Sequence, residues 1–212
     1  GDIIFSNGGN NTTVSNLTER MRIDSSGNVG IGTSAPATLM EMASTSPVLR
    51  ITNTTDSAWS AGDDIGRLSF YSTDPSAVGA HETAFILNES DFGSGVTQLS
   101  GALSFGTAAY NAAATERMRI DSSGNLLVGT TSTAVSSSTG SVTGTVINNT
   151  GLFEAAKTGT VMELNRLTDD GTILNFRKDG TTVGNISVTA SATAYNTSSD
   201  QRLKENIADA DD

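Results

Sequence analysis

Two stretches of the chain repeat one pattern of hydrophobic and polar positions. Residues 18–28 recur without change as residues 115–125, 97 residues later, and each copy runs on into a short apolar segment. On both sides of a Ser-Ser-Gly sequence, large apolar residues fall at every second position, which places them on one face of an extended chain. The pattern predicts a β-hairpin in each copy, and the long identity predicts a duplicated module.

The spacing also predicts the turn of this hairpin. For Ile23 to lie opposite Val29, the loop between them must hold an odd number of residues. The Ser-Ser-Gly sequence supplies three, and Gly27 adopts a left-handed conformation without steric cost. The other predicted pairs are Met21 with Ile31 and, in the second copy around Gly124, Met118 with Val128 and Ile120 with Leu126.

A third hairpin is predicted further along the chain. Leu174 and Phe176 precede a Lys-Asp-Gly sequence that ends at Gly180, and Ile186 and Val188 follow it. A three-residue loop ending at this glycine would place the four apolar residues on one face. Other strands are expected in short apolar stretches bounded by turn residues, namely 3–6, 48–52, 65–71, 84–88, 102–105, 142–147 and 161–165.

Two segments carry weaker signals. Residues 39–43 are expected to form one helical turn at most. Residues 130–140 are rich in Ser and Thr, and we expect them to be a linker or an extended crossover.

Large apolar residues are scarce in this chain. Leu, Ile, Val and Phe make up 45 of the 212 residues, about 21%, which is near the roughly 20% below which charged chains are usually disordered. Ordering a residue costs about 1.5 kcal/mol, so a single copy has little core to offset that cost. The regular turn chemistry favours folding, and several copies that share a core would relieve the shortage. The composition permits a trimer without requiring one.

Charge and composition exclude several classes of function. The net charge is −11, whereas binding to nucleic-acid phosphates requires clustered Lys and Arg. The chain has no Cys, which excludes disulfides and thiol-ligated zinc. It has no apolar run near the roughly 18–20 residues of a membrane helix and no signal-peptide pattern. We expect no membrane insertion and no cofactor, and we attribute the acidity to solubility.

One constellation near the end of the sequence has a chemical interpretation. Ser199 lies five residues before Lys204, with Asp200 and Arg202 between them. A hydroxyl becomes a nucleophile when a base removes its proton, and Lys acts as that base only if its pKa falls. Desolvation and a nearby cation such as Arg202 both act in that direction.

The same residues also fit a purely structural interpretation. Residues 198–201 match a capping box, with Leu203 and Ile207 on one face of a helix that would follow. The two interpretations are compatible.

Residues 197–207, Thr-Ser-Ser-Asp-Gln-Arg-Leu-Lys-Glu-Asn-Ile, resemble the start of the C-terminal intramolecular chaperone of bacteriophage tail fibres and endosialidase-type tailspikes. In that family the chaperone trimerises the fibre and then cleaves itself off at a Ser-Asp junction with a Ser/Lys pair. Ser199 and Lys204 match the pair, and Asp200 and Arg202 are the supporting residues. The resemblance implies cleavage at Ser199–Asp200 in a full-length parent. It implies no activity here, because the chaperone is incomplete after Asp212.

The resemblance also sets the expected fold and domains. It implies an all-β, elongated and intertwined homotrimer of short strands and hairpins, like a triple β-helix or β-prism shaft with small β-rich knobs. The expected modules are 1–33, the end of a β-repeat module; 34–130, a complete module; 131–198, a last module with the Ser/Thr-rich crossover; and 199–212, the truncated start of the chaperone.

The expected function is mechanical and adhesive rather than enzymatic. A trimeric shaft or tip of a tailed-phage fibre, assembled in the host cytoplasm and carried in the virion, would attach to a bacterial surface glycan or outer-membrane protein. Three copies would strengthen a weak site through avidity. Aromatic residues able to stack on a sugar are Trp59, which fits a core position equally well, Tyr71 and Tyr110.

Alternatives remain at this point. The chain could be the stalk of a tailspike polysaccharide depolymerase whose catalytic domain lies upstream, although carboxylates do not recur on successive predicted strands. A cellular protein with the same chaperone is disfavoured by the lack of a basic DNA-binding segment. We expect His81 to be a loop or surface histidine rather than a metal ligand, and the pairs at 63–64 and 169–170 to be turn residues rather than catalytic or calcium-binding carboxylates.

Overall fold

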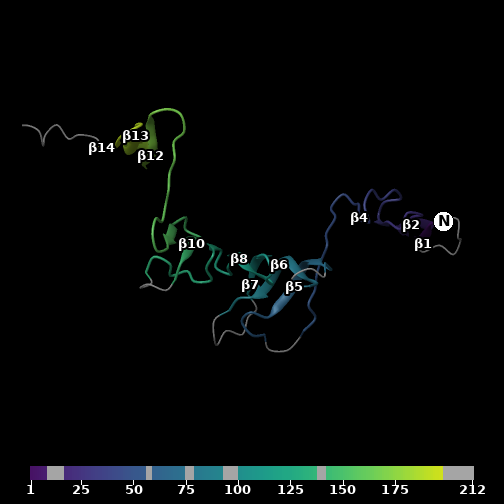
Figure 1. The fold of residues 1–212 in the computed structure, drawn as a ribbon. Helices are drawn as coiled ribbons and strands as arrows, with labels where there is room; N and C mark the ends of the chain where they lie inside the picture. Colours follow the sequence, from purple (N-terminus) through teal and green to yellow (C-terminus); the bar gives the residue numbers. More distant parts are fainter. Residues whose placement is uncertain (9–16, 56–58, 75–78, 93–99, 138–141, 198–212) are drawn as a thin grey trace, which may run out of the picture. The chain divides into compact units, whose positions relative to one another are not determined.

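The computed structural model describes residues 1–8, 17–55, 59–74, 79–92, 100–137 and 142–197. In this part of the chain all fourteen regular elements are β-strands, and they form three sheets (Figure 1). The all-β prediction is confirmed. None of the described residues belongs to a helix that could span a membrane.

The chain divides into two compact units, and the division passes through β5, β6 and β7. One unit comprises Gly1–Ser69 and Ile86–Gly101, and the other comprises Phe70–Phe85 and Ala102–Asp212. The module boundaries expected after residues 33, 130 and 198 stay a prediction.

The first sheet has the strand order β1-β2-β3-β4. Met21 pairs with Ile31 and Ile23 with Val29, as the spacing predicts. Gly27 closes the three-residue loop with a φ of 86°, and its N–H donates to the Asp24 carbonyl at 3.0 Å. The strands are β1 (Ile3–Gly8), β2 (Leu17–Ile23), β3 (Val29–Ile31) and β4 (Met40–Met42).

The helical turn expected in residues 39–43 is wrong, because this segment forms β4. Strand β4 runs parallel to β3, with Met40 beside Val29 and Met42 beside Ile31. The N–H of Val29 donates to the Leu39 carbonyl, and the N–H of Ala43 donates to the Ile31 carbonyl, both at 2.8 Å. Pairing with the edge of β3 therefore outweighs the helical preference of Leu and Met.

The second sheet has the order β11-β10-β9-β8-β7-β6-β5. It contains the second copy of the repeat, where Met118 pairs with Val128 and Ile120 with Leu126, as predicted. Gly124 has a φ of 83°, like its counterpart in the first copy. The strands are β5 (Asp64–Ser72), β6 (His81–Ser90), β7 (Gly101–Ala108), β8 (Ala114–Ile120), β9 (Leu126–Val128), β10 (Gly144–Ile147) and β11 (Phe153–Ala156).

A small core lies against one face of this sheet. Leu127, Val135 and Val146 are buried together, with Val142 and Ala156 packed around them. Val135 belongs to the Ser/Thr-rich segment expected to be a linker, yet only 1% of its surface is exposed. The described part of this segment covers one face of the sheet and is not a free linker, because its one large apolar side chain packs into the core.

The third sheet corrects the predicted turn of its first hairpin. Lys178 pairs with Thr181, so the loop holds only Asp179 and Gly180. Their φ values of 50° and 79° are those of a type I′ turn. The order is β12-β13-β14, and the strands are β12 (Gly171–Lys178), β13 (Thr181–Val188) and β14 (Thr193–Thr197).

A β-bulge nevertheless restores the predicted apolar face. The register shifts between Phe176 and Arg177, and beyond this shift Leu174 pairs with Ile186. One extra residue on β13 therefore offsets the shorter turn. Val188 pairs with Gly171 after a second shift, and it lies two residues from Ile186 on the same face of β13.

Two predicted strands are absent from the structure. Residues 48–52 and 161–165 form no strand in the described structure. The other predicted strands are present with small changes in their ends, and β11 and β14 had no sequence prediction. The first of these segments nevertheless lies beside β5: the Ile51 side chain lies against Gly66, and the Asn53 amide donates to the Asp64 carbonyl at 3.1 Å.

Candidate functional site

The residues of the predicted self-cleavage chemistry, Ser199, Asp200, Arg202 and Lys204, lie outside the described residues. Their chemistry therefore stays a prediction from sequence.

The three aromatic residues proposed for sugar contact differ in exposure. Tyr110 is 92% exposed in the loop between β7 and β8, next to Asn111, whose φ is 58°. Tyr71, on β5, is 63% exposed. Trp59 is half-buried, which also fits its alternative role in packing. None of the three lines the hollows described below.

The most prominent feature of the second sheet is a row of five large apolar side chains, one from each of β7 to β11. Each residue of the row pairs with the row's residue on the neighbouring strand. The two ends are 37% and 53% exposed, so none of the described chain covers them fully. We call this row the five-residue ladder; its members are Leu103, Ile120, Leu126, Ile147 and Phe153.

The opposite face of the same strands is covered. Leu127 and Val146, which alternate with ladder residues, form the core with Val135. The N–H and hydroxyl of Ser136 both donate to the Glu154 carboxylate, at 3.4 and 2.8 Å, and so hold the covering segment to β11. The sheet has one closed face and one open apolar face.

The first sheet repeats this arrangement. Two apolar rows cross all four strands, and side chains in both rows are exposed. We call them the paired rows; one contains Ile3, Ile23, Val29 and Met40, and the other contains Phe5, Met21, Ile31 and Met42.

The opposite face is again covered by the segment that follows the repeated hairpin. A Cβ atom placed on Gly30 would lie 2.6 Å from the Thr33 carbonyl oxygen and 3.4 Å from Pro36. Gly30 and Pro36 are buried. Gly30 occupies the position of Leu127 in the second copy, so both modules close the same face and leave the same face open.

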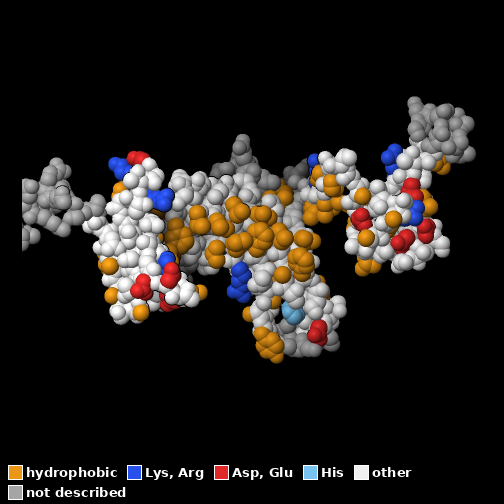
Figure 2. All heavy atoms as spheres, turned by 90° about the horizontal axis from the view of Figure 1, so that it is seen from above, with side chains coloured by type: hydrophobic (Ala, Val, Ile, Leu, Met, Phe, Trp, Pro, Cys, Tyr) orange, Lys and Arg blue, Asp and Glu red, His pale blue; other side chains and the backbone are white. Residues whose placement is uncertain are grey.

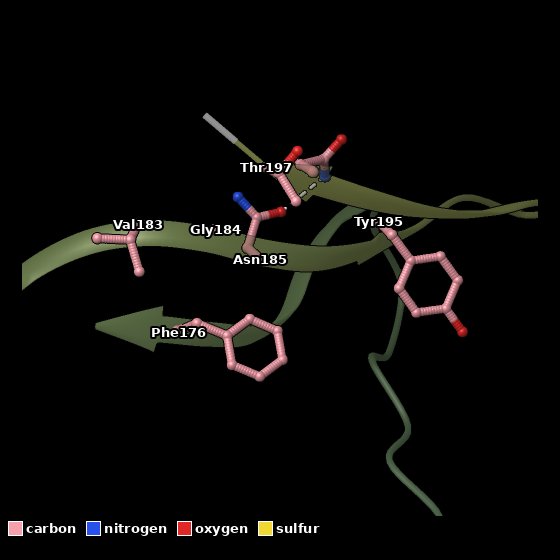
Figure 3. A pocket seen from close by; sticks show the side chains of 7 residues that line it. Phe176, Val183, Gly184, Asn185, Tyr195 and Thr197 are labelled. Carbon is pink, nitrogen blue, oxygen red and sulfur yellow. Dashed lines mark hydrogen bonds between the residues drawn. The ribbon is translucent and has the colours of Figure 1, made fainter. Parts of the chain in front are cut away.

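The third sheet also has an open apolar face, and it is hollowed between two aromatic rings (Figure 3). The rings of Phe176 and Tyr195 lie on one side of the sheet, and the Asn185 side chain points to the other. The hollow has a volume of about 280 Å³. At Gly184, which lines it, an added Cβ would meet the Asn196 carbonyl oxygen at 2.8 Å.

Asparagine side chains bind one another on the reverse side of this sheet. The Asn196 amide donates to the Asn185 oxygen at 2.7 Å and to the Ser187 hydroxyl at 2.9 Å. The third sheet is thus polar on one face and apolar on the other, like a sheet with one buried face.

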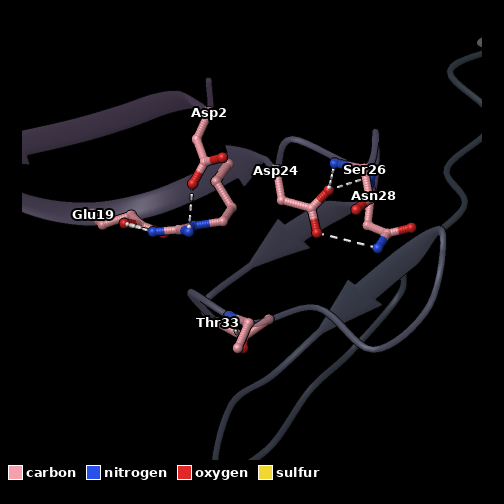
Figure 4. A network of polar contacts seen from close by, with 8 residues as sticks. Asp2, Glu19, Asp24, Ser26, Asn28 and Thr33 are labelled. Carbon is pink, nitrogen blue, oxygen red and sulfur yellow. Dashed lines mark hydrogen bonds and ion pairs between the residues drawn. The ribbon is translucent and has the colours of Figure 1, made fainter.

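A polar network stabilises the repeated hairpin (Figure 4). Two guanidinium nitrogens of Arg22 donate to the Glu19 carboxylate at 2.6 and 2.7 Å, and a third donates to Asp2 at 2.9 Å. The Asp24 carboxylate accepts the N–H groups of Ser26 and Asn28 at 2.8 and 2.9 Å.

These contacts shift the ionisation of the network. The hydrogen bond from Arg22 is the main cause that lowers the pKa of Glu19, and the same bond raises the pKa of Arg22. The backbone N–H of Asn28 is the main cause that lowers the pKa of Asp24. Both carboxylates are held in their charged form, as turn and strand residues rather than proton donors.

The remaining acidic and histidine candidates have local roles. His81 lies 2.6 Å from the Gly79 carbonyl through Nδ1. Asp63 accepts the N–H of Ser60 at 2.6 Å, and Asp169 pairs with Arg166 at 2.9 Å beside a hollow of about 210 Å³. No group of three or more potential metal ligands occurs among the residues that the structure describes.

The chain was compared with known proteins. No protein-family model matches it, and no curated protein is similar to it at a significant level.

Sequence reasoning missed that the repeat includes the preceding strand. In the structure, Phe5 pairs with Met21 as Phe105 pairs with Met118, and in both strand pairs the register shifts directly after the Phe because the partner strand has one extra residue. The alternating pairs Ile3/Phe5 and Leu103/Phe105 were the available signal. The loop between this strand and the repeated hairpin differs in length between the two copies. A comparison of the sequence with itself at one constant offset therefore does not detect the similarity.

Proposed function

We propose that this chain is a structural and adhesive segment of a tailed-phage fibre that assembles as a homotrimer. The observation that carries the proposal is the open apolar face that recurs on both copies of the duplicated module. In the part of the chain that the structure describes, six hydrophobic residues are buried and 28 large hydrophobic residues are exposed. Hydrophobic side chains accordingly occupy a broad area of the surface (Figure 2).

Covering these open apolar faces would stabilise the protein. Burying a large apolar side chain is worth about 1.5–3 kcal/mol relative to leaving it exposed. A ladder of five such side chains, each partly exposed, represents several kcal/mol that a neighbouring surface would recover. Monomeric proteins rarely expose large contiguous apolar patches, and such patches mark interaction sites.

The resemblance of residues 197–207 to the trimerising chaperone supports an assembly of three copies rather than two. An open face on each copy would turn toward a common axis, and the covered faces would lie outward. In a full-length parent, hydrolysis of the peptide bond at the Ser199–Asp200 junction, with Ser199 and Lys204 as the Ser/Lys pair, would release the chaperone after assembly.

The adhesive part of the proposal rests on exposed aromatic side chains. Tyr110 and Tyr71 project from the sheet that carries the five-residue ladder, and an aromatic ring can stack on the apolar face of a sugar. A bacterial surface glycan or an outer-membrane protein is the proposed target. Binding of the trimer to intact host cells, compared with a Tyr110→Ser variant, tests this role.

Light scattering on the purified chain tests the assembly. The expected mass is three times 21.8 kDa, or about 65 kDa. A folded species that remains at 21.8 kDa over the whole accessible concentration range would overturn the proposal.

A further inference from the structure

The apolar hollow of the third sheet lies over a position that has no side chain (Figure 3). Phe176, Gly184 and Thr197 pair across β12, β13 and β14, so the glycine leaves the middle of this row empty. Phe176 and Tyr195 border the empty position and are 49% and 78% exposed. The hollow of about 280 Å³ is larger than the cavity of roughly 150 Å³ that holds a benzene molecule. An aliphatic side chain therefore fits into it.

The chain leaves the third sheet at this hollow. Thr197, the last residue of β14, itself lines the hollow, so the segment that follows begins beside the opening. Leu203 is six residues further along, at most about 20 Å away in extended chain. A group on so short a tether has an effective concentration in the millimolar range. The C-terminal segment of the same chain is therefore the nearest candidate to fill the hollow.

The sequence of that segment suits an apolar surface. Residues 198–201 match a capping box, and Leu203 and Ile207 fall on one face of the helix predicted to follow. These two are the only large apolar residues after Thr197. A short helix is marginal in water, and most of its stability in a protein comes from packing its apolar face. The predicted helix therefore needs an apolar surface, and the third sheet exposes one.

The charges of the sheet and of the segment are complementary. Residues 171–197 contain two basic side chains and one acidic side chain, a net charge of +1 in a chain whose total is −11. Residues 198–212 contain five acidic and two basic side chains, a net charge of −3. The two basic residues of the sheet, Arg177 and Lys178, are exposed and directly follow Phe176. Attraction between these charges favours contact, and salt would weaken it.

We propose that residues 198–207 fold back onto the third sheet of the same copy, with Leu203 in the hollow over Gly184 and Ile207 beside it. The segment would then cover the open apolar face of this sheet. The inference does not depend on the number of copies that assemble, because the segment and the sheet belong to one chain. Cleavage at Ser199–Asp200, as proposed for the parent, would remove the tether of the covering residues and so uncover the hollow.

Tyrosine labelling of the full chain tests this docking. Hydroxyl radicals modify exposed rings, and mass spectrometry gives a rate for each tyrosine. Tyr195 is 78% exposed and Tyr110 is 92% exposed, so an open hollow gives two similar rates. With the segment docked, we expect Tyr195 to be labelled at least about threefold more slowly than Tyr110, because packed side chains cover its ring. Equal labelling of the two rings in the unaltered chain would overturn the proposal.

A charge placed on the segment identifies which residue protects the ring. Leu203→Asp should restore fast labelling of Tyr195, because an unpaired carboxylate is costly to bury in an apolar hollow. Ala210→Asp adds the same charge outside the apolar pair and should leave Tyr195 protected. Protection that persists in Leu203→Asp would assign the hollow to another occupant, such as a neighbouring copy, and would also overturn the proposal.

An engineered disulfide tests the contact directly. The chain has no Cys, so Val183→Cys combined with Leu203→Cys introduces the only thiols. A disulfide needs Cα atoms within about 7 Å of each other, and Val183 borders the hollow. We expect a disulfide within one copy, found by mass spectrometry of the denatured protein. Ala113→Cys with Leu203→Cys, at an exposed loop position, is the control and should cross-link more slowly. A disulfide between copies, or a rate equal to that of the control, would contradict docking within one copy.

Discussion

Glu19 and Arg22 lie on the same face of the first sheet although they are three positions apart along β2. Residues that far apart in a regular strand point to opposite faces. Ser6 pairs with Glu19 and Phe5 with Met21, so Arg20 is the extra residue of a β-bulge. The bulge brings the carboxylate within 2.6 Å of the guanidinium, and the second copy has the same pair, Glu116 and Arg119, at 2.6 Å.

The carboxylates of this network predict acid sensitivity of the first sheet. Contacts in the folded state lower the pKa of Glu19 and of Asp24. Their contribution to stability is therefore present above the unfolded pKa values, roughly 4, and is lost as the pH falls through the lower folded values. Unfolding in denaturant, measured from pH 5 down to pH 2, is expected to show falling stability.

The control is a Glu19→Gln and Asp24→Asn double variant, which should be less stable at pH 5 and should depend less on pH below it. A wild-type chain with the same pH slope as this variant would count against the network.

The turn of the repeated hairpin predicts a glycine requirement. An added Cβ at Gly27 meets nothing within 4 Å, but its φ is 86°. The cost of Gly27→Ala therefore comes from the backbone alone and is expected to be about 1 kcal/mol. Gly27→Asn should cost less, because Asn tolerates the left-handed region better. Chemical denaturation compares the two, and equal losses would mean that conformation is not the cause.

The core of the second sheet predicts a large loss on truncation. Leu127 is fully buried with Val135 and Val146, so Leu127→Ala should lower the free energy of unfolding by about 2–5 kcal/mol. Tyr110→Ala, at a side chain that is 92% exposed, should change it by less than about 0.5 kcal/mol. Thermal unfolding followed by circular dichroism would separate these outcomes, and similar losses would show that the core is misassigned.

The five-residue ladder predicts where a charge prevents assembly. Ile120 lies within the ladder, between Leu103 and Leu126. Ile120→Asp places an unpaired carboxylate on that face, and burying it costs several kcal/mol. If the chain assembles as proposed, we expect this variant to dissociate into folded or partly folded single copies on size-exclusion chromatography with light scattering. Ala113→Asp, at an exposed loop position, adds the same charge elsewhere and should leave the proposed trimer intact.

Local patterns were sufficient where neighbours along the chain decide the structure. The alternation around Gly27 and Gly124 predicted strand pairs that the structure confirms, because a hairpin needs only its own two strands and its turn. The open apolar face of the first sheet was predicted in part in the same way. Alternation placed Met21 and Ile23 on one face, but their partners on β1 and β4 could not be assigned from spacing.

The third hairpin shows where such reasoning fails. Asp179 and Gly180 form a shorter turn than the apolar pattern suggested, and the β13 bulge opposite Phe176 and Arg177 absorbs the difference. The hairpin keeps both a favourable two-residue turn and a common apolar face, but its strand pairing becomes irregular. A pattern that counts residues cannot see an extra residue inserted in one strand.

By itself the sequence determined the strand-rich class, the duplicated hairpins and the shortage of core residues, because these depend on local alternation, turn chemistry and composition. Only the tertiary structure decided which face of each sheet is covered, that Val135 belongs to a core, and that Met40–Met42 pairs with β3. Those outcomes depend on which distant segments meet. Burial of an apolar side chain is favourable against any apolar surface that fits it. The spacing of residues along the chain does not specify which distant segment provides that surface.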